Sequence, residues 1–216
     1  MKTAVVAGGP YQGTDKLKCI LEDCDRIIAC DSGADLVVSA GLVPEKVIGD
    51  LDSIDESVRA HLQDLGIPFE VYPAEKDMTD SELGLMEASS DAEVIFICPL
   101  RGRIDHVLSN IELAVRLHEE GMNITVTDGV SDLIPLSGPD EVTVSGLTDP
   151  ESVTVSLIPF TTVTGVNSEG LYYKLDNASV KPGSSLTVSN KPEQGGNSFT
   201  ISVNSGNMGV LIIPTE

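Results

Sequence analysis

The sequence predicts an α/β N-terminal domain with a mostly parallel sheet, followed by a C-terminal all-β sandwich domain. Up to about residue 128, short apolar runs alternate with amphipathic segments of helical period. After residue 130 the apolar residues alternate with Thr and Ser, and turn signals such as Lys181-Pro182-Gly183 separate the runs at short intervals. Strands that alternate with helices are typical of a parallel sheet, whereas closely spaced strands are typical of an antiparallel sandwich or barrel. We therefore expect two domains, 1–130 and 131–216, with the boundary near residues 131–139.

Each strand expected in the first domain is a short apolar run, and the expected helices carry recognisable ends. The strands are 4–7, 27–30, 46–48, 69–72, 94–98 and 124–127. The helices are 32–40, 55–65, 80–89 and 104–120. Gly41, Gly66 and Gly121 each follow a helix, as glycines do at helix C-termini, and Thr79 and Glu82 have the spacing of a capping box. A sheet built in this way is covered by helices on both faces.

The second domain is expected to contain strands alone. Runs of alternating polar and apolar residues predict strands at 153–158, 171–175, 185–188, 198–203 and 210–213. Side chains that alternate along a strand place one apolar face toward a partner sheet, which favours the sandwich.

The charge of the chain is strongly negative. Its 216 residues include 34 acidic and 13 basic ones (Lys and Arg), which gives a formal net charge of −21. Such a charge repels nucleic acids and anionic membranes, so we exclude both as partners. It also repels a nucleoside triphosphate, so any phosphate chemistry requires a divalent metal and a few well-placed basic residues.

The sequence predicts neither a membrane span nor a secretion signal. No apolar run approaches the ~20 residues of a spanning helix, and the apolar run at the start ends at Gly8-Gly9-Pro10, too early for a signal peptide. The four cysteines form no CxxC pair and the three histidines are scattered, so we expect reduced thiols and no zinc site. These features favour the cytoplasm.

Charged residues, with Ser, Thr and Gly beside them, follow successive strands of the expected parallel sheet. They are Asp31, Ser32 and Gly33 after the second strand, Asp50, Asp52 and Ser53 after the third, Lys76, Thr79 and Asp80 after the fourth, and Arg101, Arg103 and Asp105 after the fifth. Ligands of open α/β sheets bind at the carboxyl ends of the strands. Gathered carboxylates need a cation, and oxygen-rich clusters select Mg²⁺ or Ca²⁺. The basic residues in the same loops are suited to phosphate.

Each loop taken alone also has a purely structural interpretation. An Asp before a helix is often only an N-cap, and Asp80 has a favourable place at a helix N-terminus. Asp50 and Asp52, two residues apart and flanked by Gly49 and Ser53, look least like caps. The chain has neither a Walker-type phosphate loop nor a GxGxxG dinucleotide motif.

Three of these loops carry extended motifs: Gly-Asp-Leu-Asp-Ser at 49–53, Lys-Asp-Met-Thr-Asp at 76–80 and Gly-Arg-Ile-Asp-His at 102–106. In their order and spacing they resemble the motifs of the thiamine pyrophosphokinase family. The resemblance continues through 31–35 and Asn110, and then through 168–175 and 188–190 in the second half. It implies a catalytic α/β domain that binds ATP and Mg²⁺, and a β-sandwich domain for thiamine binding and dimerisation. The implied enzyme is a homodimeric transferase that moves diphosphate from Mg-ATP to thiamine and releases AMP.

The resemblance also implies roles for individual residues. Asp50, Asp52 and Asp80 would hold Mg²⁺, and the catalytic set would be completed by Arg103 and Asp105. The ATP-binding residues would be Asp31, Ser32, Gly33, Ser53, Lys76, Thr79 and Asn110. Ser189 and Asn190 would bind thiamine. Two assignments stay open: whether Asp80 or Asp105 is the general base, and which side chain covers the thiamine rings in a chain without Trp.

Three other functions compete with this interpretation. A diphosphokinase for another alcohol, such as a hydroxymethylpterin, would keep the acidic loops and change the second domain. A catalytically dead nucleotide- or thiamine-binding regulator would be expected to have lost one of Asp50, Asp52 and Asp80. A structural protein that binds Mg²⁺ or Ca²⁺ would not need Arg103 and Lys76 among its carboxylates.

Overall fold

The computed structural model describes residues 1–73, 75–88, 93–147 and 149–215. The chain divides into two compact units. The first unit contains Met1–Ala114 and Gly121–Val130, and the second contains Val115–Glu120 and Ser131–Glu216. None of the helices in the described part of the chain combines the length and the apolar character that crossing a membrane requires.

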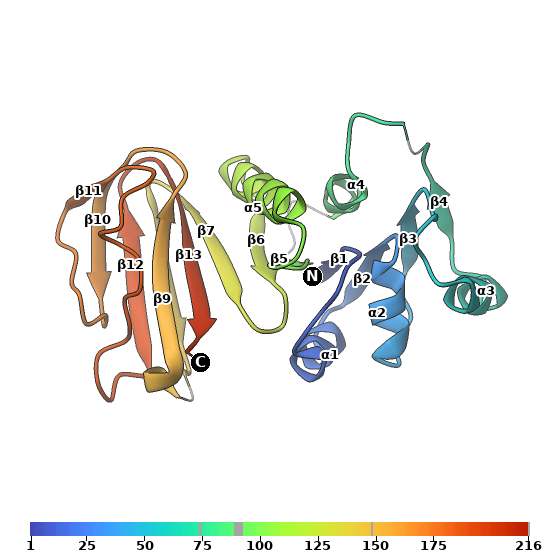
Figure 1. Cartoon of the computed structure of the whole chain (residues 1–216), viewed down its shortest axis with the longest axis horizontal. Helices are drawn as coiled ribbons and strands as arrows, with labels where there is room; N and C mark the ends of the chain where they lie inside the picture. Colours follow the sequence, from blue (N-terminus) through green and yellow to red (C-terminus); the bar gives the residue numbers. More distant parts are fainter. Residues whose placement is uncertain (74, 89–92, 148, 216) are drawn as a thin grey trace. The chain divides into compact units, whose positions relative to one another are not determined.

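The first unit is built around a parallel sheet (Figure 1). Its strands are β1 (Lys2–Val6), β2 (Arg26–Cys30), β3 (Lys46–Gly49), β4 (Phe69–Val71), β5 (Glu93–Ile97) and β6 (Asn123–Thr127). Their order is β4-β3-β2-β1-β5-β6, and every neighbouring pair is parallel. The predicted parallel sheet is confirmed, and all of its strands have their carboxyl ends at one edge.

Helices lie on both faces of this sheet. They are α1 (Thr14–Glu22), α2 (Gly33–Ser39), α3 (Glu56–Asp64), α4 (Asp80–Glu87) and α5 (Ile104–Glu119), of which the last turn of α5 belongs to the second unit. Leu17, Val37 and Leu62 bring α1, α2 and α3 into one buried cluster with the sheet. Helix α4 lies on the other face, where Gly84 packs so closely that a Cβ would come within 2.4 Å of Cys30 Sγ.

Helix α1 was not predicted, whereas most other elements of this unit begin and end within one or two residues of the predicted bounds. Helix α1 begins after Gly13, whose φ is 66°, and it buries only Leu17 and Leu21. Two apolar contacts on a short helix are too few to give a clear helical period. The last residue of the helix predicted at 80–89 lies outside the described residues.

The second unit is an antiparallel sandwich, as predicted. Its strands are β7 (Asp132–Ser137), β8 (Asp140–Ser145), β9 (Val153–Pro159), β10 (Val163–Glu169), β11 (Ala178–Val180), β12 (Ser198–Val203) and β13 (Asn207–Pro214), with a 3₁₀ turn at Pro150–Ser152. One layer has the order β7-β13-β9 and the other β11-β10-β12-β8. Leu157 and Val210 from the first layer and Phe199 and Ile201 from the second belong to one buried core.

The strands predicted at 171–175 and 185–188 are wrong. In their place the structure has turns and a single bridge between Leu171 and Pro192. The Asn190 side chain binds both backbone groups of Tyr173: its Oδ1 accepts from the N–H at 3.0 Å, and its Nδ2 donates to the carbonyl at 2.7 Å. A side-chain amide therefore satisfies the backbone where a partner strand would otherwise be needed.

Four strands of the sandwich were not predicted. They are β7, β8, β10 and β11. Pro135 lies inside β7, and Gly138 and Pro139 connect β7 to β8, so this region carries the residues that usually indicate a loop. Gly165 lies inside β10 with a φ of 67°, at a register shift between β10 and β11. Irregular strands of this kind lack the simple alternation on which the prediction depended.

Candidate functional site

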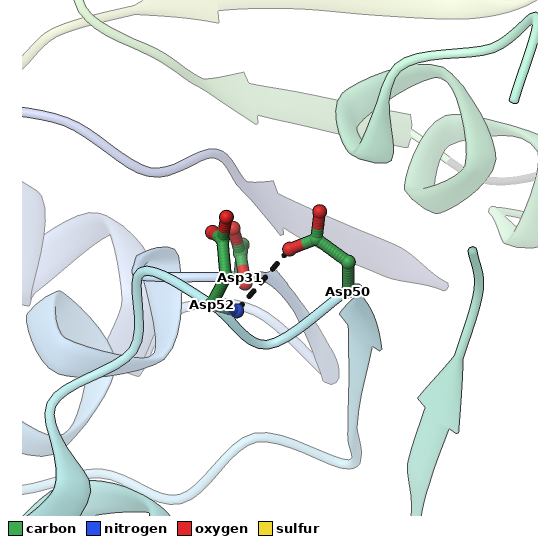
Figure 2. A group of neighbouring side chains, drawn as sticks. All are labelled: Asp31, Asp50 and Asp52. Carbon is green, nitrogen blue, oxygen red and sulfur yellow. Dashed lines mark hydrogen bonds between the residues drawn. The ribbon is translucent and has the colours of Figure 1, made fainter. Parts of the chain in front are cut away.

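Carboxylates that follow neighbouring strands meet at the carboxyl edge of the first sheet. Asp31 follows β2, and Asp50 and Asp52 follow β3. One carboxylate oxygen from each of the three lies within 4.8 Å of the others. Figure 2 shows the three side chains projecting the same way from their loops, and its dashed line is the 3.2 Å bond that the Asp52 N–H donates to Asp50 Oδ1. We call Asp31, Asp50 and Asp52 the acidic cluster.

The backbone between the two carboxylates after β3 explains why both face the same way. Leu51 lies between Asp50 and Asp52, is buried, and packs in the core cluster under the sheet. Its φ is 65°, a left-handed conformation that costs a residue with a side chain about 1–2 kcal/mol. Burial of Leu51 anchors the turn and leaves its two acidic neighbours outside the core. Strain of this type is found preferentially at functional sites.

Asp80, at the start of α4, lies beside the acidic cluster. A Cβ at Gly49, whose φ is 152°, would lie 3.3 Å from the Oδ1 atoms of both Asp31 and Asp80. Glycine at the end of β3 therefore leaves room for both carboxylates. Thr79 caps the helix by accepting a hydrogen bond from the N–H of Glu82 at 3.2 Å, which confirms that half of the predicted capping box.

The carboxylates of this site are not fully compensated among the described residues. Asp31 Oδ1 and Asp80 Oδ1 are buried without a hydrogen-bond partner there. Burial is the largest cause that raises the pKa of Asp31, and the charges of Asp80, Asp50 and Asp52 raise it further, whereas a 2.7 Å hydrogen bond from Ser53 opposes the shift. The pKa of Asp52 is raised chiefly by Asp50. Mutual repulsion of this kind is what a bound cation relieves.

Two basic side chains form ion pairs with carboxylates of the site. Lys76 Nζ is 3.1 Å from Asp80 Oδ1, close enough for an ion pair although not aligned as a hydrogen bond to that oxygen. Arg103 binds Asp105 through two hydrogen bonds, Nε to Oδ1 at 3.2 Å and Nη2 to Oδ2 at 2.6 Å. The Arg103 guanidinium holds the pKa of Asp105 at about 2, so this carboxylate is ionised at neutral pH.

A cavity of about 630 Å³ opens beside the acidic cluster, within the size range of small-molecule sites. Its lining comes from the segments at and after the ends of β1, β2, β3 and β5 and from the starts of α4 and α5. The sequence-predicted residues that line it are Asp31, Ser32, Ser53, Thr79, Asp80, Arg103, Asp105 and Asn110. Asn110 is also hydrogen-bonded to the buried Cys98 thiol, whose pKa is raised by burial.

Asp50, Asp52, Lys76 and Gly33 do not belong to this lining. Asp50 and Asp52 are close to Asp31, which lines the cavity, and Lys76 forms an ion pair with Asp80, which also lines it. Gly33 has a packing reason for its identity, because a Cβ there would lie 2.1 Å from the carbonyl oxygen of Val6. Its absent side chain lets α2 approach β1 closely.

Several lining residues were not predicted as site residues. They include Gly8, Gly9 and Pro10 in the loop after β1, and Pro99 and His106 around the loop after β5. Arg101, which the sequence indicates as suited to phosphate, also lines the cavity. The position of the loop after β1 could have predicted its place in the site, because it lies at the same carboxyl edge of the sheet as the acidic loops. In the sequence, Gly8-Gly9-Pro10 indicates only the end of an apolar run.

Ser189 and Asn190 belong to the second unit and have different local roles. Ser189 is exposed in a left-handed conformation with a φ of 61°, and its N–H donates to Ser156 Oγ at 3.0 Å. Asn190 is buried, and its amide is engaged with the backbone of Tyr173. Tyr172 and Tyr173 are exposed, with ring centroids 4.9 Å apart, and Lys191 Nζ lies 5.0 Å from the Tyr172 ring centroid.

Comparison with known proteins gives matches over most of the chain. Residues 17–126 match the model of the thiamin pyrophosphokinase catalytic domain, and residues 148–208 match that of the thiamin pyrophosphokinase vitamin B1 binding domain. The thiamine pyrophosphokinase of Bacillus subtilis (strain 168) is 32% identical over 196 residues, covering 88% of this chain and 90% of the relative.

Solved structures agree with these matches. The crystal structure of thiamine pyrophosphokinase from Bacillus subtilis superposes with a TM-score of 0.86 at 25% identity, covering 100% of both chains. That of the thiamin pyrophosphokinase from Geobacillus thermodenitrificans gives 0.79 at 27% identity, covering 100% of this chain and 98% of the other. The Candida albicans enzyme shares the fold, with a TM-score of 0.81 at 16% identity over 99% of this chain and 88% of its own.

Proposed function

This chain belongs to the thiamin pyrophosphokinase family, and on that premise we propose that it carries out its reaction in the cavity at the carboxyl edge of the first sheet. It is a thiamine diphosphokinase, a transferase that moves diphosphate from ATP to thiamine and releases AMP. The observation that best supports the location is the acidic cluster beside a cavity that also contains arginine side chains. The family matches do not favour a diphosphokinase for a pterin alcohol.

We assign Asp50, Asp52 and Asp80 as the residues that hold Mg²⁺, with Asp31 beside them. Three features fit this ion: the ligand atoms are carboxylate oxygens, those of Asp50 and Asp52 lie within 4.8 Å of each other and of Asp31, and Asp80 Oδ1 is buried without a hydrogen-bond partner among the described residues. Mg²⁺ supplies positive charge to the phosphate oxygens when it is bound. Asp31 enters this group from its position in the structure, because the family motifs had placed it only among the ATP-binding residues.

The nucleotide is then held by side chains around the cavity. Ser32, Ser53 and Thr79 present hydroxyl groups, and Asn110 an amide, toward its polyphosphate and sugar. Lys76 stays close to Asp80, from where it can offset charge that the metal does not neutralise. Binding in this cavity aligns the β-phosphorus for attack, and most of the catalytic effect comes from positioning and from charge stabilisation.

Arg103 and Asp105 have a joint role in this scheme. While Arg103 pairs with it, Asp105 has a pKa of about 2 and is a poor base. Both side chains are largely exposed, so the pair opens at little cost when a phosphate competes for the guanidinium. Movement of Arg103 onto the phosphate would release Asp105 to accept the proton of the attacking hydroxyl. Asp80 stays the alternative base, and it would have to act while it is also a metal ligand.

We place thiamine against the second unit, which the vitamin B1 binding model covers from residue 148 to residue 208. Ser189 is exposed and available for direct contact, whereas Asn190 shapes the turn that carries Tyr172 and Tyr173. We also propose that the working enzyme is a homodimer in the cytoplasm. The cysteines Cys19, Cys24, Cys30 and Cys98 are all free, which suits a reducing compartment.

The test of this function is the identity of the products. Purified protein is incubated with ATP, Mg²⁺ and thiamine, and the products are identified by phosphorus NMR. Attack at the β-phosphorus gives AMP and thiamine diphosphate. Formation of ADP and thiamine monophosphate would contradict the assigned reaction.

The metal assignment is tested by Asp50→Asn and Asp52→Asn. Each change removes an anionic ligand and keeps the shape of the side chain, so turnover is expected to fall by about 100-fold or more while the circular dichroism spectrum is unchanged. Turnover close to that of the wild type, with a normal Mg²⁺ requirement, would show that these carboxylates only shape the loop.

A further inference from the structure

A second arginine in the cavity has no role in the scheme above. Arg101 follows β5 and lines the cavity together with Arg103. Its guanidinium is held at two points: Nη1 donates to Gln12 Oε1 at 2.5 Å, and Nε lies 3.5 Å from Asp128 Oδ2. Gln12 lies in the loop after β1, and Asp128 directly follows β6. Arg101 is therefore fixed between two other loops of the same sheet edge.

Asp128 is placed to orient this arginine. Its side chain is only 3% exposed, and its Oδ1 accepts a 2.9 Å hydrogen bond from the N–H of Val130. A carboxylate buried to this degree is costly unless a cation and hydrogen bonds accompany it. The Arg101 side chain, in contrast, is 44% exposed. Its planar head has five N–H donors, of which these contacts use those on Nε and Nη1, so donors remain for an anion in the cavity.

The position of Arg101 in the sheet indicates which part of a nucleotide it meets. The acidic cluster follows β2 and β3, whereas Arg101 follows β5, and β1 lies between β2 and β5. Arg101 therefore approaches the cavity from the side opposite to the metal-binding carboxylates. The transferred β- and γ-phosphates belong near the metal, and the α-phosphate stays on the other side of the bond that breaks.

We propose that Arg101 binds the α-phosphate of the nucleotide, and that Asp128 and Gln12 are positioning residues that hold it there. This inference depends on the proposed function. In the reaction, the thiamine hydroxyl oxygen forms a bond to the β-phosphorus, and the bond from that phosphorus to the bridging oxygen of the α-phosphate breaks. The electron pair goes to that oxygen, and the hydroxyl proton goes to the base. A guanidinium beside the α-phosphate stabilises the charge that AMP gains as it leaves.

The experiment compares the binding of AMP and of adenosine by calorimetry to the full-length wild type and to Arg101→Met. Loss of a charged contact is expected to weaken AMP binding by about 10- to 100-fold, whereas adenosine binding should change less than about 2-fold, because adenosine lacks the phosphate. The matched control is Arg59→Met, which removes the same charge from an exposed position of α3 outside the cavity lining. This control should bind both ligands as the wild type does.

Two outcomes would overturn the proposal. Unchanged AMP binding in Arg101→Met would show that the guanidinium does not meet the phosphate. An equal loss for AMP and adenosine would show that the side chain contacts the nucleoside or only shapes the cavity. Neither result depends on turnover, so failure of the wild type to make thiamine diphosphate would count separately, against the proposed function.

The positioning role of Asp128 is tested by a double-mutant cycle. Asp128→Asn should weaken AMP binding in the wild type and should have no further effect in Arg101→Met, because its influence passes through the arginine. Gln12→Ala provides a milder variant of the same test if Asp128→Asn unfolds. If Asp128→Asn or Gln12→Ala weakened AMP binding equally in the wild type and in Arg101→Met, the residue would have only a structural role.

Discussion

Lys76 Nζ lies 3.1 Å from Asp80 Oδ1, so a single ammonium group stands beside a carboxylate that we assign to the metal site. Both side chains are mostly buried, with 14% and 25% of their surfaces exposed. This ion pair partly replaces the charge compensation that a divalent cation would provide. It therefore links the stability of the metal-free protein to the binding of Mg²⁺.

We expect Lys76→Met to destabilise the metal-free protein by about 1–2 kcal/mol, because the variant leaves a partly buried carboxylate without its cation. Saturating Mg²⁺ should remove most of this difference. Thermal unfolding with and without Mg²⁺ measures both quantities, and Lys18→Met, which removes an exposed lysine of α1, is the control. A destabilisation that Mg²⁺ does not reduce would separate Lys76 from the metal site.

The acidic cluster should make the metal-free protein less stable as the pH rises. The pKa of Asp31 is raised above its ordinary 3.8, so the folded chain binds that proton more tightly than the unfolded chain. The free energy of unfolding must then fall as the pH rises from about 4 through the raised pKa. In Asp31→Asn this fall should be smaller, and Asn tolerates the left-handed backbone of residue 31, whose φ is 53°. Urea unfolding at a series of pH values without Mg²⁺ measures the slope.

Asp105→Asn is the matched control for this pH dependence, because its sign is opposite. Arg103 lowers the pKa of Asp105 to about 2, so this pair stabilises the fold above pH 3.8 and the contribution is lost as the pH falls toward 2. The control should therefore change the profile only below about pH 4. Equal slopes for wild type and Asp31→Asn above pH 4 would contradict the raised pKa of Asp31, which burial and then the neighbouring carboxylates cause.

Gly33 provides a test that separates packing from ATP binding. A Cβ would meet the backbone carbonyl of Val6 at 2.1 Å, and a backbone atom cannot move aside without displacing β1. We expect Gly33→Ala to lose about 1–3 kcal/mol of stability. Gly41→Ala, where the added atom meets open space but φ is 80°, should lose only about 1 kcal/mol from backbone strain. Wild-type stability in Gly33→Ala combined with weaker ATP binding would restore a direct ligand role.

The first sheet could be predicted because buried parallel strands consist of short apolar runs, and the loops that follow them are rich in charged residues. Ile28 and Val47 illustrate the runs, and Asp50 and Asp52 the loops. That Asp31 reaches the same oxygen cluster as Asp50 and Asp52 depends on strand order, which the sequence does not state. The structure was needed to bring them together.

The sandwich was harder to predict, because its irregular parts are held by single side chains. Alternation around Leu171 suggested a strand, yet the backbone of Tyr173 is bound by Asn190, which is distant in sequence. No local pattern indicates such a contact. Strand β7 was not predicted because it contains Pro135. Proline has no backbone N–H to donate, so it usually indicates a loop and not a strand.

We expect Asn190 and Ser189 to contribute to thiamine binding in different ways. Asn190→Asp keeps the oxygen that accepts from the Tyr173 N–H but removes the amide that donates to the Tyr173 carbonyl. The turn carrying Tyr172 and Tyr173 should loosen, so we expect the KM for thiamine to rise by about 10-fold, with stability reduced by about 1–3 kcal/mol.

Ser189→Ala is the contrasting change, because the Ser189 side chain is exposed and its hydrogen bond to Ser156 is made by the backbone N–H. Stability should therefore stay within about 0.5 kcal/mol of the wild type, and any rise in the KM for thiamine would report a direct contact. The KM for ATP should be unchanged in both variants, since the nucleotide is assigned to the first unit. Steady-state kinetics with each substrate varied in turn measures these constants. A rise in the KM for ATP equal to that for thiamine would contradict the assignment of thiamine to this turn.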